Sequence, residues 1–460
     1  MSLPQPLREP TADGSDRKRE RAVLVAVLVP NSRADFRDPL GELAALAKSA
    51  GTVVVDSIVQ KRPRLSPSYA LGKGKLAELV ELVEAHEADV VIFDNELTPR
   101  QIRGIEKAVN RKVIDRAELI LDIFASRAKT RESQLQVELA QLQYTAPRLR
   151  GLWTHLERIA GAAGATAAGA VGGVGTRGPG ERQIEIDRRI VQKRIGHLKN
   201  EIEGIDRRKL REATSRGDQF TVSLVGYTNS GKTTLLNTLT EAGCFVADLL
   251  FATLDTKTVR WRVGEGCSVL LSDTVGFIRD LPHHLVASFR ATLEEAIHAD
   301  LLLHVVDASA PNAFRQIEAV DGVLEELGCG DARQLLLLNK IDRCDATPLL
   351  DLLAYRKEEI LSISAKTGEG LDDLVRSVTD SYLGDTAEVT LLIPHSGGKL
   401  ISELDRLADV RGRRYESHGA ELDIRMNRTQ LKQLLGRHPA VTILKGDVDP
   451  VDDDPLEFTS

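Results

Sequence analysis

The stretch TVSLVGYTNSGKTTLLNTLT, residues 221–240, decides the class of fold. TVSLV predicts a β-strand and TTLLNTLT predicts a helix, and GYTNSGKT at 226–233 lies directly between them. This string fits the phosphate-binding P-loop pattern, and it also has the setting that the pattern requires: a strand, a tight glycine turn and a helix N-terminus. Glycines let backbone N–H groups curl around phosphate oxygens, where the helix dipole also favours negative charge.

The side chains of this loop have separate expected tasks. We expect Lys232 to reach the β- and γ-phosphates of a nucleotide and Thr233 to bind Mg²⁺. The alternative is a glycine-rich turn with an incidental Lys-Thr pair, which the strand and helix on either side disfavour. The predicted phosphate contacts are Gly226, Tyr227, Thr228, Asn229, Ser230, Gly231, Lys232 and Thr233.

Two later segments predict that the base is guanine. Asn339-Lys340-Ile341-Asp342 ends the apolar run QLLLLNK, so it falls at the carboxyl edge of a parallel sheet, where such folds bind ligands. The Asp342 carboxylate offers two acceptors to the N1–H and 2-amino group of guanine, and adenine has no donor there. We expect Asn339 to bond the other edge of the base and the stem of Lys340 to cover its face. Ser364-Ala365-Lys366 would present a backbone amide to guanine O6.

Two segments between these motifs are predicted to sense the γ-phosphate. Phe251-Ala252-Thr253-Leu254-Asp255 reads as an effector loop. Such a loop must supply one hydroxyl that contacts Mg²⁺ in the GTP state and is released after hydrolysis. We predict that Thr253 supplies it, with Thr256 and Thr258 as alternatives. The competing interpretation is that these threonines are β-formers at the start of the run TKTVRWRV.

The second sensing segment, Asp273-Thr274-Val275-Gly276, follows an apolar run. It would deliver a metal-side aspartate and a glycine that contacts the γ-phosphate. The predicted catalytic residues are therefore Lys232, Thr253 and Gly276, and the predicted metal ligands are Thr233 and Thr253. The expected cofactors are GTP or GDP and Mg²⁺.

The residue after this segment raises a mechanistic question. Ras-type enzymes place a glutamine there to orient the attacking water, whereas this chain has Phe277, which cannot hydrogen-bond water. His283 or His284 could substitute, although both open a predicted helix and more simply cap or solvate it. The favoured hypothesis is a domain that hydrolyses GTP slowly alone, with the water-orienting group supplied by a partner.

The whole chain of 460 residues is too long for one hydrophobic core. Short β-branched runs alternate with helical runs, so the fold class is α/β with parallel sheets. We expect a P-loop GTPase domain preceded by a small parallel α/β domain and a helical hairpin, with a small α+β domain at the C-terminus. The predicted ranges are a disordered N-terminus at 1–20, an α/β domain at 21–128, a hairpin at 129–216 with a Gly-rich linker at 161–180, the G domain at 219–385, the α+β domain at 388–445 and an acidic disordered tail at 446–460.

Apolar residues at helical spacing predict the hairpin, and its charge suggests a partner. Leu135, Leu139 and Leu142 mark one helix; Ile184, Ile190, Val191, Ile195, Leu198 and Ile202 mark the other. Residues 177–216 hold 12 Lys or Arg against 7 acidic residues, on a chain whose net charge is −7. This basic segment suits contacts with rRNA phosphates, although it can also be an ordinary solvated helical face.

Composition limits the remaining possibilities. The negative net charge favours a local polyanion-binding surface, and we expect no DNA partner. Cys244, Cys267, Cys329 and Cys344 have no metal-type spacing and read as reduced thiols. No strongly apolar stretch of about 18 residues occurs, so no membrane-spanning segment is expected. We expect a cytoplasmic monomer, with peripheral membrane association left open.

Several motifs together resemble one family. The strings GYTNSGKTT, FATLD, DTVGFIRDLP, NKID and SAK, preceded by QLQVELAQLQY and GGVGTRGPGERQIEIDRR, closely resemble the HflX family of ribosome-associated GTPases over residues 21–385. The resemblance implies binding to the large (50S) ribosomal subunit and its rRNA, with GTP turnover coupled to splitting, rescue or recycling of ribosomes. It also implies nucleotide contacts at 226–233, 251–255, 273–276, 339–342 and 364–366. Many relatives have Pro where this chain has Thr256, which puts the stiffness of the loop in doubt but removes no ligand.

Alternatives remain open for three features. The chain could instead be a GTP-gated adaptor, or an RNA-remodelling protein with a second nucleotide activity in its N-terminal domain. The string Tyr69-Ala70-Leu71-Gly72-Lys73-Gly74-Lys75 fits RNA contact, binding of a second nucleotide or simple loop chemistry equally well. The basic run at 411–415 is consistent with RNA contact, but a solvated loop is the favoured interpretation.

Overall fold

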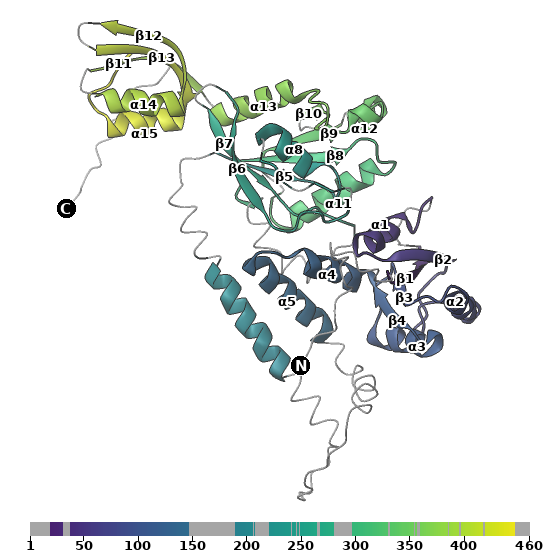
Figure 1. The fold of residues 1–460 in the computed structure, drawn as a ribbon. Helices are drawn as coiled ribbons and strands as arrows, with labels where there is room; N and C mark the ends of the chain where they lie inside the picture. The colour runs from purple at the N-terminus through teal and green to yellow at the C-terminus, as the bar shows by residue number, and fades with distance from the viewer. Residues whose placement is uncertain are drawn as a thin grey trace, which may run out of the picture.

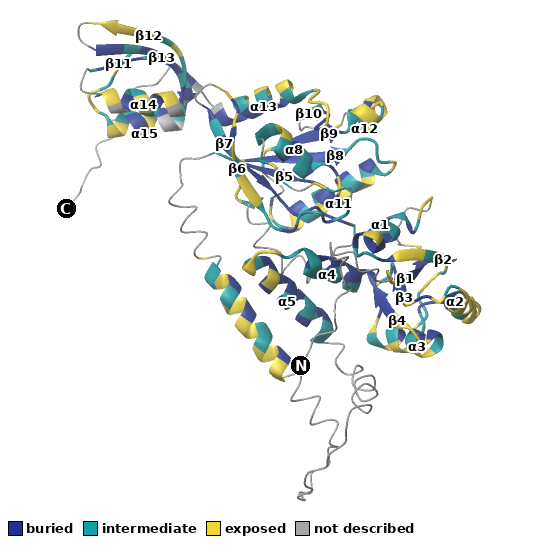
Figure 2. Ribbon diagram, in the orientation of Figure 1, coloured by how far each residue is buried: buried dark blue, intermediate teal, exposed yellow. Residues whose placement is uncertain are grey.

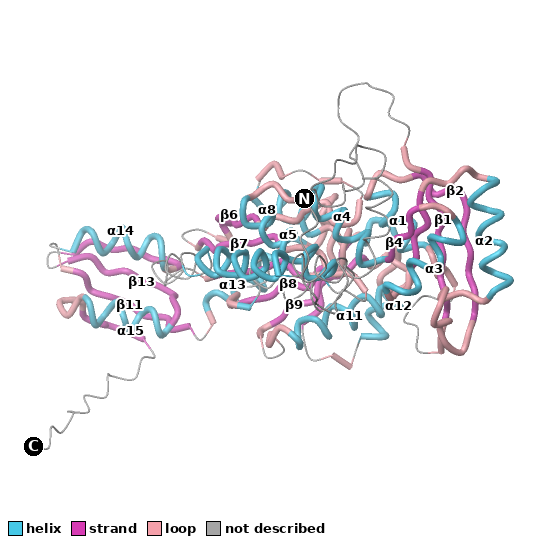
Figure 3. Tube along the Cα trace, turned by 90° about the horizontal axis from the view of Figure 1, so that it is seen from below, coloured by secondary structure: helices cyan, strands magenta, loops and turns pink. Residues whose placement is uncertain are grey.

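The computed structural model places three sheet-containing units in a row, with the six-stranded unit in the middle (Figures 1 and 3). The N-terminal four-stranded unit lies at one end and the C-terminal four-stranded unit at the other. The structure describes residues 19–30, 37–146, 189–205, 207 and 220–446, apart from gaps at 241, 245, 248, 265–266, 280–296, 330–331, 354, 357–358, 385, 395–396 and 417–418.

The N-terminal unit is a parallel sheet in the order β2-β1-β3-β4, with helices on both faces. Central strand β1 is buried on both sides: Leu24 packs in the core beneath α1 and α4, and Val25 packs in the core beneath α2 and α3. Such two-sided burial is typical of parallel sheets and explains the continuous apolar runs (Figure 2). The elements are β1 Arg21–Leu28, α1 Gly41–Ser49, β2 Val53–Lys61, α2 Lys73–Ala85, β3 Val90–Phe93, α3 Pro99–Val109, β4 Lys112–Asp115 and α4 Arg116–Arg127.

The predicted helical hairpin is confirmed. Helix α5, Arg131–Thr145, packs against a helix at 189–205 through a small apolar core that includes Leu135, Leu139, Val191, Leu198 and Ile202. The helices are antiparallel, since Arg131 near one end of α5 pairs with Glu201 at 3.0 Å while Glu138 accepts two 2.8 Å bonds from Arg194. Ile190 is 53% exposed and lies off this seam. The predicted linker at 161–180 and Ile184 lie outside the described residues.

The middle unit is a six-stranded sheet in the order β10-β9-β8-β5-β7-β6, parallel except for β6. Its parallel strands therefore end at one common edge. The predicted P-loop, the segment 273–276 and the loops at 339–342 and 364–366 all follow such strand ends. The elements are β5 Thr221–Val225, α8 Lys232–Thr240, β6 Lys257–Arg262, β7 Ser268–Asp273, β8 Leu301–Asp307, α11 Ala313–Glu326, β9 Gln334–Asn339, η2 Ile341–Arg343, α12 Thr347–Leu353, β10 Glu359–Ser362 and α13 Leu371–Leu383.

The C-terminal unit is an antiparallel sheet in the order β12-β13-β11-β14, with α14 and α15 packed on one face. The sequence prediction of a loop at 411–415 is wrong: these residues belong to edge strand β12, which pairs with β13 through a bulge near Gly412. Backbone pairing with β13 orders the run, although Arg414 and Tyr415 stay exposed. The elements are β11 Thr386–Ile393, α14 Gly398–Leu407, β12 Asp409–Glu416, β13 Gly419–Asn427, α15 Arg428–Arg437 and β14 Thr442–Gly446.

One apolar core is shared between the N-terminal unit and the middle unit. Phe124 and Ile120 of α4 lie in the same buried cluster as Phe251, Phe277 and Val320 of the middle unit. In Figure 1, α4 accordingly lies directly against the middle unit. The loops that contain Phe251 and Phe277 are thus packed against another domain.

All four cysteines are free, and burial raises the pKa of the Cys267 and Cys329 thiols, which makes them poor nucleophiles. Within the described ranges, we find no helix that combines the length and the apolar character needed to cross a membrane.

A buried carboxylate links the end of β4 to helix α5 and yields a first prediction. Asp115 is fully buried, and it accepts hydrogen bonds from Tyr144 Oη at 2.6 Å and from the backbone N–H of Leu97 at 3.1 Å. Tyr144→Phe should lower the free energy of unfolding by about 2 kcal/mol, because a bond to a buried charge is lost. Denaturant unfolding would measure this, with Tyr355→Phe, a residue 70% exposed, as the matched control. Equal stability of the two variants would contradict the assigned bond.

Candidate functional site

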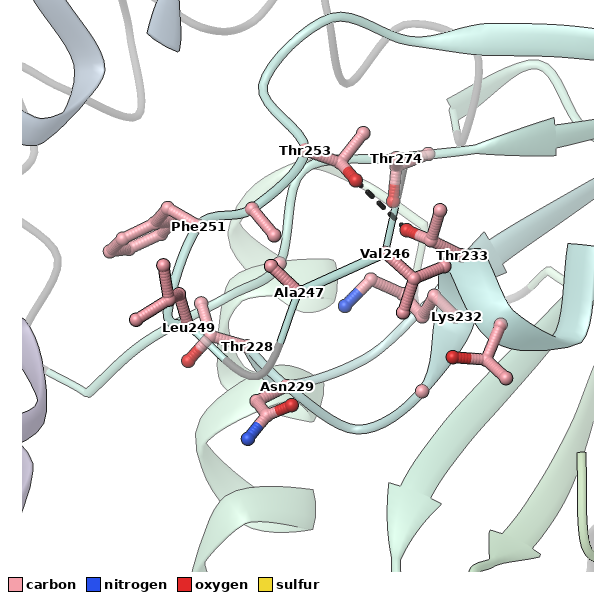
Figure 4. A pocket seen from close by; sticks show the side chains of 14 residues that line it. Thr228, Asn229, Lys232, Thr233, Val246, Ala247, Leu249, Phe251, Thr253 and Thr274 are labelled. Atoms are coloured by element: carbon pink, nitrogen blue, oxygen red, sulfur yellow. Dashed lines mark hydrogen bonds between the residues drawn. The ribbon is translucent and has the colours of Figure 1, made fainter. Parts of the chain in front are cut away.

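A hollow of about 440 Å³, partly open to solvent, lies at the carboxyl edge of the six-stranded sheet (Figure 4). The P-loop forms one side, and Val246, Ala247, Leu249 and residues 251–253 form the other. The described lining residues are Thr228, Asn229, Gly231, Lys232, Thr233, Thr234, Val246, Ala247, Leu249, Phe251, Ala252, Thr253, Thr274 and Gly276. The structure thus gathers most of the predicted phosphate-side residues around one space. Sequence reasoning missed Val246, Ala247 and Leu249, because small apolar residues carry no chemical signal.

The backbone of the P-loop explains its glycines. Gly231 has φ +99°, and a Cβ there would lie 2.3 Å from Asn339 Nδ2. Gly226 has φ +147°, and a Cβ there would lie 2.2 Å from the Val305 carbonyl oxygen. Residues with a side chain rarely adopt such conformations, and none would fit these spaces. The loop is therefore shaped by neighbouring strands before any ligand binds.

Lys232 is held inside this loop. Its Nζ donates to the carbonyl oxygens of Gly226 at 3.0 Å and Tyr227 at 2.8 Å. Burial lowers the pKa of Lys232 to about 8, with the nearby Lys340 acting in the same direction and Asp273 opposing it. A bound phosphate would supply the negative charge that this buried ammonium lacks.

Three oxygen-bearing side chains meet at this site, and two of them, Thr233 and Thr253, line the hollow. Thr233 Oγ1 lies 2.8 Å from Thr253 Oγ1 and donates to Asp273 Oδ2 at 2.6 Å (Figure 4 shows the first contact). Asp273 is buried, and this burial raises the pKa of its carboxyl; its second oxygen has no hydrogen-bond partner among the described residues. Hydroxyl and carboxylate oxygens suit Mg²⁺, which keeps several waters, so these residues fit that ion.

The alternative threonine Thr258 lies elsewhere. Its hydroxyl is 2.9 Å from Ser272 Oγ in the β6–β7 pair, whereas Thr253 lines the hollow. The position of the hydroxyls therefore favours Thr253 as the metal ligand, as the sequence predicted.

Asn339 braces two loops. Its Nδ2 donates to the carbonyl of Ser230 at 2.9 Å, and its Oδ1 accepts from the backbone N–H of Ala365 at 2.9 Å. The sequence predicts that Asn339 bonds the base, whereas in this structure both ends of its amide are used to tie the P-loop to the 364–366 segment.

Asp342 follows strand β9 and lies in the short helix η2. It is exposed at the same sheet edge, and Ser364 Oγ donates to its Oδ1 at 2.7 Å, which lowers the pKa of the carboxyl. Lys340, with φ +69°, turns its Nζ to Asp307 Oδ2 at 2.6 Å and to the Asn229 carbonyl at 2.8 Å. Asp307 was missed by sequence reasoning, although it ends strand β8 at this edge.

Some predicted contact residues do not line the hollow. Leu254 and Val275 are buried in the interdomain core, and Ile341 packs beneath α11 and α12. Asp255 accepts from Thr130 Oγ1 at 2.7 Å, so its carboxylate faces the helical hairpin. These side chains therefore support their loops by contacts on the side that faces away from the hollow.

Phe277 also points away from the hollow. It is 2% exposed, and its side chain lies in the core shared with α4. Its backbone N–H donates to the Gly226 carbonyl at 3.0 Å, and its carbonyl accepts from the N–H of Thr228 at 2.7 Å. The segment after Gly276 is therefore bonded directly to the P-loop.

A charged cluster, which sequence reasoning did not find, lies beside Phe277. Arg116 of α4 is paired with Glu42 at 2.8 Å and with Asp94 at 2.9 Å, and Arg279 is paired with Asp94 at 3.0 Å. The Tyr227 hydroxyl donates to Glu42 and accepts from the backbone N–H of Arg279. The cluster joins three elements of the N-terminal unit to the P-loop, and no short motif signals it.

Two other predictions concern residues away from this hollow. His283 and His284 lie outside the described residues. In the string at 69–75, the N–H of Gly72 donates to Gln60 Oε1 at 2.9 Å, and Lys75 pairs with Glu78 at 2.7 Å. These groups have partners within the domain, which favours the loop interpretation of that string.

A strand–loop–helix cradle, an aspartate at the end of β7 and base-side loops at the same sheet edge define the class of P-loop GTPases. Four family descriptions match consecutive parts of the chain. They are GTP-binding GTPase N-terminal at 37–125, GTP-binding GTPase Middle Region at 127–216, 50S ribosome-binding GTPase at 221–340 and HflX C-terminal domain at 350–442.

Full-length relatives identify the family more closely. The chain is 42% identical over 426 residues to GTPase HflX of Escherichia coli (strain K12), covering 92% of this chain and 97% of the relative. It is 46% identical over 358 residues to GTPase HflX of Lacrimispora saccharolytica, covering 77% and 81%. A GTP-binding protein from Sulfolobus solfataricus in complex with GDP is 24% identical with a TM-score of 0.42, covering 79% of this chain and 98% of that one. The chain belongs to the HflX family of GTPases.

The base-side geometry yields a second prediction. Asp342→Asn should weaken binding of GTP by at least about tenfold, because one of two acceptors for guanine becomes a donor and a charge-assisted bond is lost. The same change should improve binding of xanthosine triphosphate, whose base has an acceptor in place of the 2-amino group. Fluorescent-nucleotide titration would measure both affinities. Unchanged preference for GTP would show that Asp342 does not contact the base.

Proposed function

We propose that this chain is a Mg²⁺-dependent enzyme that hydrolyses GTP to GDP and phosphate, slowly by itself and faster on the large ribosomal subunit. One observation carries the rate argument: the Phe277 side chain is buried in the interdomain core. The described residues that line the hollow include no Gln, His, Asp or Glu. A group that orients water would then come from a partner, which is worth about 10³–10⁵ in rate in GTPases of this kind.

The chain's own residues would bind and orient the nucleotide. Lys232 and the P-loop amides would stabilise the β- and γ-phosphates, and the N–H of Gly276 would contact the γ-phosphate as the leaving bond breaks. Thr233 and Thr253 would hold Mg²⁺, which neutralises charge between the β- and γ-phosphates when bound. Asp342, whose carboxylate accepts a hydrogen bond from Ser364 Oγ, would select guanine.

The proposed partner is the large ribosomal subunit with its rRNA. The family description that matches residues 221–340 reads 50S ribosome-binding GTPase. The second hairpin helix exposes Arg189, Lys193 and Lys199 to solvent, where they suit phosphate contacts that do not depend on sequence. GTP turnover would be coupled to splitting, rescue or recycling of ribosomes, by a cytoplasmic monomer.

The third prediction tests this proposal directly. Purified large subunits should raise the rate of GTP turnover about 10²-fold or more, because docking would complete the water-orienting machinery. Phosphate release is measured with the chain alone, with large subunits and with small subunits. Lys232→Ala should abolish turnover in every case. Brisk turnover by the chain alone that ribosomal particles leave unchanged would contradict the proposal.

The fourth prediction concerns the phenylalanine itself. Phe277→Gln should not accelerate GTP turnover of the isolated chain, because this position faces the interdomain core. It should instead lower the free energy of unfolding by about 3 kcal/mol or more, through lost packing and a buried amide. Single-turnover hydrolysis and thermal unfolding would be measured on the same preparation. Faster hydrolysis by a stable variant would show that the side chain at 277 reaches the hollow.

A further inference from the structure

Three contacts hold the loop at 249–255, here called the switch loop, from the side opposite the hollow. The first is at its start. The backbone N–H of Leu250 donates to Ser49 Oγ at 3.0 Å, and Ser49 is the last residue of α1 in the N-terminal unit. Ser49 is itself buried and tied to its helix by a 2.9 Å bond to the Ala45 carbonyl. The acceptor for the switch loop is therefore fixed.

The second contact holds a strained residue. Phe251 has φ +57°, a conformation that is rare for a bulky residue and costs free energy. Its ring meets the ring of Phe124 on α4 edge to face, with centroids 4.7 Å apart, and is 2% exposed. Such backbone strain persists only where the surroundings impose it. Here the surroundings are the helix of another domain, and Figure 4 shows the Phe251 ring directed away from Lys232.

The third contact is a helix cap that crosses between domains. Asp255 accepts from Thr130 Oγ1 at 2.7 Å and from the backbone N–H of Lys129 at 3.3 Å. Thr130 is the N-cap residue of α5, so the carboxylate lies at the positive end of a helix of 15 residues. An anion at this place is stabilised by the helix dipole as well as by the two bonds.

These contacts lie on both sides of Thr253. They fall three residues before it, two residues before it and two residues after it, so the chain between them has little freedom. Between these anchors, Thr253 Oγ1 lies 2.8 Å from Thr233 Oγ1, where both hydroxyls can share one metal ion. The N-terminal unit and the helical hairpin thus hold the switch loop in the closed arrangement, from the side opposite the hollow.

We propose that Thr130 is a positioning residue for Thr253, acting through Asp255, and that docking of the N-terminal unit and the helical hairpin against the middle unit selects GTP over GDP. This rests on the proposed function of the hollow. A γ-phosphate and its Mg²⁺ contact Thr253, whereas GDP ends short of it, so only GTP gains from a loop that is already closed. By linkage, GTP strengthens the docking of the N-terminal unit and the hairpin by the same factor.

The experiment compares affinities of the full chain for a non-hydrolysable GTP analogue and for GDP, both with Mg²⁺. Asp255→Ala and Thr130→Val should each weaken analogue binding about 5- to 20-fold and change GDP binding less than about twofold. The double variant should lose no more than Asp255→Ala alone, because that change already removes the bond from Thr130. Thr130→Ser keeps the hydroxyl and should restore the wild-type analogue affinity.

A matched control separates this role from helix stability. Thr130 also accepts from the N–H of Ser133 at 3.2 Å, so Thr130→Val removes a cap of α5. Thr98 caps α3 in the same way, accepting from the N–H of Gln101 at 3.3 Å, and α3 lies on the other face of the N-terminal sheet. Thr98→Val should lower the melting temperature but leave the ratio of the two affinities unchanged. Asp255→Ala leaves the α5 cap in place.

The outcomes are distinct. The inference alone would be overturned if the wild-type chain binds both nucleotides but the variants keep the wild-type affinity for the analogue. It would also be overturned if the variants lose affinity for the analogue and for GDP equally. Additive losses in the double variant would also overturn it, because the two residues would then act independently. A wild-type chain that binds neither nucleotide would overturn the proposed function, and the inference with it.

Discussion

The burial of Phe251 and Phe277 in one apolar core with helix α4 is the constraint on which the rest of the site depends. Phe277 directly follows Gly276, and Phe251 lies two residues before Thr253, the two residues proposed to contact the γ-phosphate and its metal ion. Both loops around the hollow therefore take their shape from packing against a second domain. A small change in that packing would move Thr253 and Gly276 together, because close-packed interiors transmit strain.

Charged side chains set the relative orientation of the two units at this interface. A buried pair of arginines and acids contributes little net stability compared with apolar packing, but it tolerates few alternative geometries. Arg116, Arg279, Glu42 and Asp94 form one network of ion pairs, which also includes the Tyr227 hydroxyl. Apolar burial thus holds the domains together, and the charged cluster fixes how the P-loop lies against them.

Local patterns in the sequence predicted the fold and the phosphate side of the site, because these depend on neighbouring residues. A strand, a glycine turn and a helix place Lys232 and Thr233 without reference to the rest of the chain. The remaining roles depend on contacts between distant segments: Asp255 meets Thr130 across 125 residues, and Asn339 braces Ser230 across 109. The prediction of a loop at 411–415 was wrong for the same reason, because pairing with the distant strand β13 makes this run a strand.

The central claim is that the nucleotide acts on the switch loop from one side, and that the N-terminal unit and the helical hairpin act on it from the other. Hydrogen exchange of the backbone amides at 124–131 tests it most directly, because these residues lie on the far side of that loop from the hollow. The account predicts that exchange there slows when GDP is replaced by a non-hydrolysable GTP analogue, with no ribosome present. Identical exchange in both nucleotide states would contradict it.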